Sequence, residues 1–80
     1  MTPKQRQDVF ALVHQAMKDW AEECGRLVTK RNGTTETWTP EDDRLYFQAE
    51  HLYSHYTNLC AALSEEWPEI RKRFGPWQKV

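Results

Sequence analysis

The sequence predicts an all-α fold in which a long antiparallel helical hairpin is followed by a short third helix. Two observations predict the hairpin. Thr-Pro occurs twice, at residues 2–3 and 39–40, and threonine followed by proline is typical of a helix start. Behind each start, apolar residues recur at spacings of three and four, as on one face of a helix. We expect residues 1–80 to form a single helical domain.

The first helix is expected to run from residue 3 to about 30. Gln5 follows the threonine cap at the spacing of a capping box. Gly25 costs about 1 kcal/mol relative to alanine inside this helix, and Asn32-Gly33 is the better stop because both residues tolerate the left-handed conformation. The expected apolar stripe consists of Phe10, Val13, Met17, Trp20, Cys24 and Leu27.

The second helix is expected to run from residue 40 to about 64. The polar connection KRNGTTETW suits a turn, so the two helices are antiparallel and the numbers of facing residues sum to about 70. Its expected apolar stripe consists of Leu45, Ala49, Leu52, Tyr56, Leu59 and Leu63.

A short third helix is expected over residues 68–74, with an extended tail over 75–80. Trp67-Pro68 interrupts the second helix, and Gly75-Pro76 ends the third. Trp67 is expected to plug the open end of the hairpin. Two helices cannot bury so wide a stripe, so the third helix or a second copy of the chain must cover the rest. Homodimerisation into a four-helix bundle therefore stays open.

The composition limits the classes of partner. The net charge of −1 lacks the strong basic excess that nucleic-acid or acidic-membrane binding normally requires. The charge is uneven, however, because the stretch from Glu36 to Glu66 is acidic and residues 68–80 are basic. No secretory signal and no apolar run of about 20 residues is apparent, so we expect a cytoplasmic protein.

The spacing of His51 and His55 raises the question of a metal site. Residues four apart on a helix stand one above the other, so both imidazoles could reach one ion. A helical wheel places His14 on the opposite edge of the hairpin, beside Tyr53, and a bare HxxxH is a weak signal. We expect no metal, and a metal-binding protein built on this pair is kept as an alternative.

No other residues form a catalytic pattern. Cys24 and Cys60 should lie about 20 Å apart along the hairpin, too far for a disulfide, and both suit small core positions. The carboxylates Glu41, Asp42 and Asp43 occupy a first helical turn, where they complement the helix dipole. We therefore expect no enzymatic activity and no cofactor.

The residues that the fold does not need predict a protein-binding surface. Phe47 falls roughly 140° from the stripe of its helix, on the outer face with Glu50 and near His51. The third helix could also cover it. Trp38 cannot form a hydrophobic staple because its partner position holds Asp43. Trp38 and Trp77 are each either a structural lid or a partner contact. The predicted protein-binding residues are Phe47, Glu50, His51, Trp38, Trp77, Glu41, Asp42 and Asp43.

The basic run Arg71, Lys72 and Arg73, followed by Phe74 and Trp77, gives an alternative. Cations interleaved with aromatic rings are typical of nucleic-acid contacts. Cations in the last turn of a helix also complement its negative end, which explains the run without any ligand.

The expected function is that of a non-enzymatic module that docks on a larger protein and regulates or inhibits it. The acidic stretch suits a basic, nucleic-acid-binding target, although nucleic acid itself is not the expected partner. Short, tryptophan-rich helical proteins are typical of phages and mobile elements, where they block host machinery such as CRISPR effectors. The alternatives are a nucleic-acid-binding regulator, a metal-binding protein and a purely structural dimerisation unit.

Overall fold

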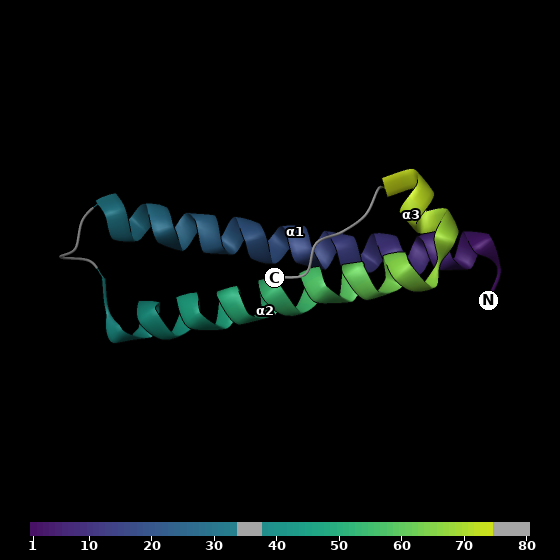
Figure 1. Cartoon of the computed structure of the whole chain (residues 1–80). Helices are drawn as coiled ribbons and strands as arrows, with labels where there is room; N and C mark the ends of the chain where they lie inside the picture. Colours follow the sequence, from purple (N-terminus) through teal and green to yellow (C-terminus); the bar gives the residue numbers. More distant parts are fainter. Residues whose placement is uncertain (34–37, 75–80) are drawn as a thin grey trace.

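In the computed structural model, which describes residues 1–33 and 38–74, the chain is a helical hairpin with a short third helix (Figure 1). Helix α1 spans Pro3–Gly33, α2 spans Pro40–Glu66 and α3 spans Pro68–Phe74. The described residues contain no strand. The predicted fold class is confirmed. Helix α1 ends three residues later than expected and α2 two residues later, while the extended tail predicted for 75–80 lies outside the described residues.

Both long helices begin as their sequences predict. The amide of Gln5 donates to Thr2 Oγ1 (3.1 Å), and the Thr2 amide donates to Gln5 Oε1 (2.8 Å). Thr39 and Asp42 form the same reciprocal pair at the start of α2. Each box satisfies two amides that would otherwise lack a partner, which fixes where the helix starts.

The molecule is a rod, and its core is thin. Its Cα atoms extend over 51 × 19 × 15 Å with a radius of gyration of 15.6 Å, whereas a compact chain of this length has a radius of about 12 Å. The fully buried centre consists of Phe10, Cys60 and Ile70, one residue from each helix. Trp67 packs against this centre, as predicted for the open end of the hairpin.

The register of the hairpin follows the predicted sum of about 70. Phe10 and Cys60 meet in the core, and their numbers sum to 70. At the turn, Lys30 Nζ lies 2.9 Å from Asp42 Oδ2, and these numbers sum to 72. The ion pair and the core contact therefore fix the two ends of the hairpin in one register.

The face of α2 that packs on α1 differs from the predicted leucine stripe. Its buried face is rotated by roughly 90° from that stripe. Leu45 is 37% exposed, and only Ala49 belongs to both sets. Small side chains permit a closer approach of two helices than leucines do, and the buried Thr57 hydroxyl donates to the Tyr53 carbonyl (2.8 Å). The buried small residues of α2 are Ala49, Thr57, Cys60, Ala61 and Ser64.

Helix α3 closes one edge of the hairpin. Ile70 is fully buried, and the ring of Phe74 lies 5.0 Å from that of Phe10. The His14 ring stacks on Phe10 and also faces Phe74. An ion pair joins Arg6 to Glu69. These contacts hold α3 against the side of α1 that carries His14.

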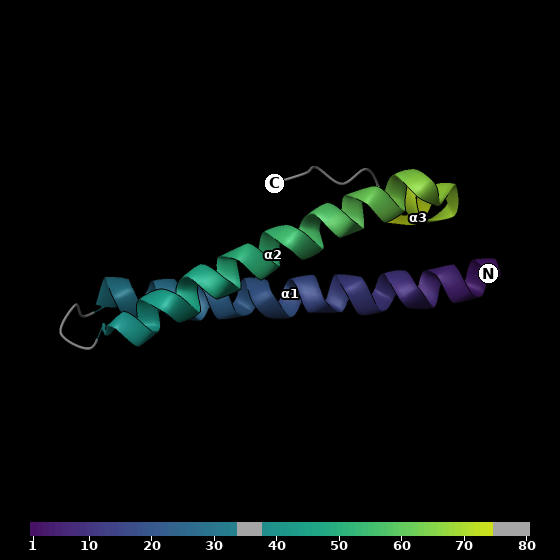
Figure 2. The same cartoon turned by 90° about the horizontal axis from the view of Figure 1, so that it is seen from below.

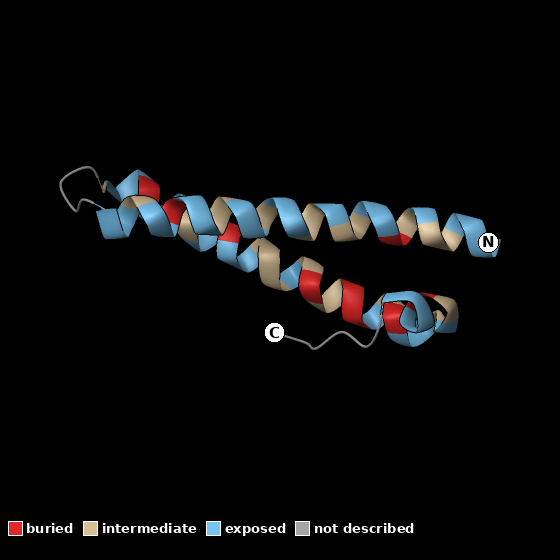
Figure 3. Cartoon of the chain, turned by 90° about the horizontal axis from the view of Figure 1, so that it is seen from above, coloured by how far each residue is buried: buried red, intermediate tan, exposed pale blue. Residues whose placement is uncertain are grey.

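Within residues 1–33 and 38–74, no third element packs on the opposite side of the hairpin. Leu12 points about 160° away from His14 around α1, and Trp20 points about 120° away. Leu12 is 74% exposed and Trp20 is half-buried. Figure 2 shows the two long helices crossing at an angle, and Figure 3 shows pale, exposed segments between the buried positions along α1. We refer to the side formed by Leu12, Ala16, Trp20 and Leu45 as the open edge.

Replacing Ile70 by alanine should lower the free energy of unfolding by about 2–5 kcal/mol, because this residue anchors α3 in the core. Phe47→Ala is the matched control, since Phe47 is 73% exposed and its loss should change stability by no more than about 0.5 kcal/mol. Urea unfolding followed by circular dichroism measures both variants. Equal destabilisation by the two substitutions would contradict the position of the core.

Candidate protein-binding surface

An aromatic side chain stands among polar groups on the outer face of α2. Residues three, four and seven apart on a helix share one side, so this helix brings Phe47 next to Glu50, His51 and Ser54. These four residues line a shallow hollow of about 250 Å³, and we call them the Phe47 patch. The structure therefore brings together three of the predicted protein-binding residues.

The third helix does not cover the Phe47 patch. Helix α3 lies at the other end of the rod, near the N-terminus of α1 (Figure 1). Phe47 keeps 73% of its surface exposed, and Glu50 and His51 are exposed as well. The sequence left two possibilities for Phe47, an outward position or cover by the third helix. The structure has Phe47 in the outward position.

Trp38 extends this face toward the turn. Its indole N–H donates to Asp43 Oδ1 (3.1 Å), its ring meets the edge of Tyr46, and the Arg31 guanidinium lies 5.7 Å from the ring centre. The hydrophobic staple is absent, as expected, but a hydrogen bond to the same position replaces it. Trp38 is half-buried by these contacts, so it covers the start of α2. Asp43 lies four residues before Phe47 on the same side of the helix.

The three acidic residues of the first turn have separate roles. Asp42 is only 8% exposed, because its carboxylate closes the capping box and pairs with Lys30. Asp42 is therefore removed from the predicted contact residues. Glu41 pairs with Arg44 along the surface of α2, while Asp43 bonds to Trp38. Glu41 and Asp43 are both exposed.

The environment of Asp42 lowers the pKa of its carboxyl group. The hydrogen bond from Lys30 is the largest cause, and the Thr39 amide adds to it. Both interactions stabilise the ionised form more than the protonated form. The charged carboxylate therefore stabilises the turn end of the hairpin at neutral pH.

The histidines do not converge. His51 and His55 are exposed on α2, and His55 meets the ring of Tyr56 at its edge. His14 lies on the edge that α3 covers, against Phe10 and Phe74. Within residues 1–33 and 38–74, no three His, Cys, Asp or Glu side chains are placed to hold a metal ion.

Both cysteines are free thiols. Cys60 is buried in the core, as predicted. Cys24, which was also predicted to be a core residue, is only half-buried. Burial raises the pKa of both thiols, and Glu50 and Glu23 raise that of Cys24 further. A raised pKa keeps a thiol protonated and weakens it as a nucleophile.

The basic run of the alternative function lies on α3. Arg71, Lys72 and Arg73 are all exposed. Arg73 Nη1 donates to Gln7 Oε1 (3.3 Å), and its guanidinium lies 5.4 Å from the centre of the Phe74 ring. Arg73 thus helps to hold α3 on α1. Trp77, the remaining predicted contact, lies outside the described residues.

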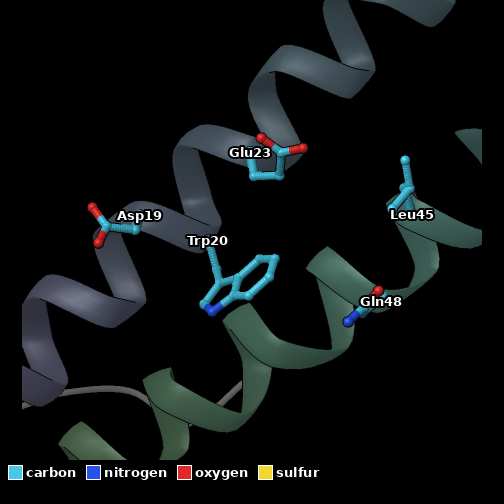
Figure 4. A pocket seen from close by; sticks show the side chains of 5 residues that line it. All are labelled: Asp19, Trp20, Glu23, Leu45 and Gln48. Atoms are coloured by element: carbon cyan, nitrogen blue, oxygen red, sulfur yellow. The ribbon is translucent and has the colours of Figure 1, made fainter.

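The sequence interpretation missed a second hollow, on the open edge. It has a volume of about 340 Å³ and lies between α1 and α2. Figure 4 shows the Trp20 indole reaching from α1 toward α2, where Gln48 and Leu45 line the other wall. We call it the Trp20 hollow. Its lining residues are Asp19, Trp20, Glu23, Leu45 and Gln48.

Two carboxylates stand at the α1 side of the Trp20 hollow. Glu23 pairs with Arg26 one turn later, and the hydrogen bond from Arg26 is the main reason why the pKa of Glu23 is lowered. Asp19 accepts a hydrogen bond from Gln15 Nε2 (2.9 Å). The sequence pattern assigned Trp20 to the apolar stripe of the first helix, whereas the structure leaves it half-buried beside this hollow. The small-residue face of α2 is the sequence signal that could have corrected this placement.

Comparison with known proteins finds no counterpart. No family model, no curated protein and no solved structure matches the chain. The function must therefore be argued from the surface itself. None of the helices in the described ranges has an apolar stretch that could cross a membrane.

Replacing Asp42 by asparagine should reduce the loss of stability on acidification. A carboxyl group with a lowered pKa contributes fully above its unfolded value of about 3.9, and this contribution disappears as the pH falls through the folded pKa. Asp43→Asn is the matched control, because asparagine can still accept from the Trp38 indole. Thermal unfolding between pH 6 and pH 2 measures the slope, and equal slopes for wild type and Asp42→Asn would contradict this role.

Proposed function

We propose that this chain is a non-enzymatic protein-binding module of the cytoplasm that docks on a larger protein through the outer face of α2 and regulates or inhibits it. The observation that carries the proposal is the exposure of Phe47. An aromatic side chain that is 73% exposed on a regular helix, one turn before Glu50 and His51, contributes little to the fold. Aromatic residues are enriched at protein interfaces.

The energetics of docking favour this surface. Burying a Phe side chain completely gains about 1.5–3 kcal/mol relative to leaving it exposed. The patch lies on a continuous helix, so its backbone loses little conformational freedom when a partner binds. A shallow hollow around an aromatic ring also lets a partner side chain enter beside it.

The charge of the surface supports a basic partner. Asp43 and Glu50 flank Phe47, four residues before it and three after it on the same side of α2. A basic protein approaches an acidic surface faster and in a preferred orientation. Proteins that bind nucleic acids carry such basic surfaces. An inhibitor of a nucleic-acid-binding protein, of the kind encoded by phages or mobile elements, therefore fits this face.

Affinity capture with the tagged chain from its native host tests the proposal. We expect it to retain a larger protein with an excess of Lys and Arg, whose nucleic-acid binding falls when the chain is added. Phe47→Ala should weaken the complex by about 10- to 100-fold, the factor that corresponds to the lost burial. Raising the salt concentration should slow association.

Val28→Ala is the matched control, because it truncates a partly exposed apolar residue of α1 and leaves α2 unchanged. It should bind like wild type. The proposal fails if no protein is retained, or if Phe47→Ala and Val28→Ala retain the same amount. A retained partner that keeps its full nucleic-acid binding would remove the inhibitory role.

A further inference from the structure

The open edge carries a projecting side chain and a hollow on the same side of α1. Leu12 is 74% exposed, and the Trp20 hollow of about 340 Å³ lies farther along the same helix. Leu12 comes seven residues before Asp19 and eight before Trp20, which is about two helical turns or 12 Å. A leucine side chain is much smaller than this hollow, yet Leu12 cannot fold back into the hollow of its own helix.

We propose that a second copy of this chain packs antiparallel on the open edge, with Leu12 of each copy inserted into the Trp20 hollow of the other. A two-fold axis makes the two insertions equivalent. The dimer is then a four-helix bundle, in which each hairpin covers the half-buried Trp20 and Leu45 of its partner.

The register of this packing follows from residue numbers. In an antiparallel pair of α1 helices, residues 12 and 20 face each other when the axis lies at their midpoint, residue 16. That position holds Ala16, whose small side chain lets two helices approach closely.

The charges agree with the same register. Asp8 and Arg26 are 18 residues apart, which is five helical turns, so both point to one side of α1. Their midpoint is residue 17. An axis at Ala16 therefore leaves Asp8 of one copy displaced by only about 3 Å along the helix from Arg26 of the other. The long Arg26 side chain spans this offset, so each Arg26 forms one ion pair with Asp8 of the other copy while it stays next to its own Glu23.

A parallel arrangement lacks these features. It would place Asp19 and Glu23 of one copy against the same residues of the other, and like charges in an interface disfavour association. It would also set Leu12 against Leu12 and leave both hollows empty. The open edge is thus complementary to itself in the antiparallel orientation alone.

Sedimentation velocity of the purified chain tests the dimer. We expect a dimer at submillimolar concentration, and Leu12→Lys should shift it to monomer by placing a charge in the hollow. Phe47→Lys is the matched control, because it introduces the same charge at an equally exposed apolar position on the other face, and it should remain dimeric. A monomeric wild type, or a dimer that Leu12→Lys leaves intact, would overturn the proposal.

Cross-linking provides a second measurement that does not require a disruptive variant. In a Cys24→Ser background, Ala16→Cys should form a disulfide-linked dimer with oxidised glutathione, because the axis brings the two thiols together. Ala11→Cys should run as a monomer on a non-reducing denaturing gel, since Ala11 points about 140° away from Ala16 around the helix. Equal cross-linking of the two variants would contradict the predicted axis.

The dimer does not depend on the proposed function. Both measurements use the purified chain alone, and the Phe47 patch lies outside the open edge. A monomer in solution would leave the proposed docking surface of α2 standing. Loss of partner capture by Phe47→Ala in a chain that remains dimeric would show that two separate faces are used.

Discussion

The packing of α2 on α1 through a buried row of small side chains is the constraint on which the rest of the structure depends. Ala49, Cys60 and Ala61 are buried between the helices, together with the short polar residues of the same face. Packing through this face leaves the leucine stripe of α2 roughly 90° to one side of the contact. Helix α3 then closes one rim through Ile70. The other rim keeps Leu45 partly exposed and forms the wall of the Trp20 hollow.

A hairpin of this kind has a thin core and a large surface. The free energy of folding must come from few fully buried apolar residues, so a binding partner that covers a rim also adds stability. The rod presents two faces with different properties. The outer face of α2 has an aromatic residue among acids and suits a basic protein, whereas the open edge has a projection and a hollow that suit a second copy of the chain.

The features that the sequence predicts correctly are those decided by local interactions. The caps at Thr2 and Thr39 depend on contacts over three residues, and the antiparallel register depends on the position of the turn. The outward position of Phe47 follows because it lies far from either candidate for the buried face of α2. The rotation of α2 about its own axis could not be predicted in this way. Packing through its leucines competes with packing through its small side chains, and local spacing does not decide between them.

The candidate site follows the same division. The sequence identifies Phe47, Glu50 and His51 as neighbours from helical spacing alone. The sequence also predicts Asp42 as a contact residue. Its ion pair with Lys30 joins two different helices, so helical spacing could not show that Asp42 is buried. The most direct test of the account compares the unfolding free energies of Ala61→Leu and Leu45→Ala. Packing through the small-residue face predicts that Ala61→Leu costs about 1–3 kcal/mol through overpacking and that Leu45→Ala costs less. The reverse order would show that α2 packs through its leucines and would contradict the account.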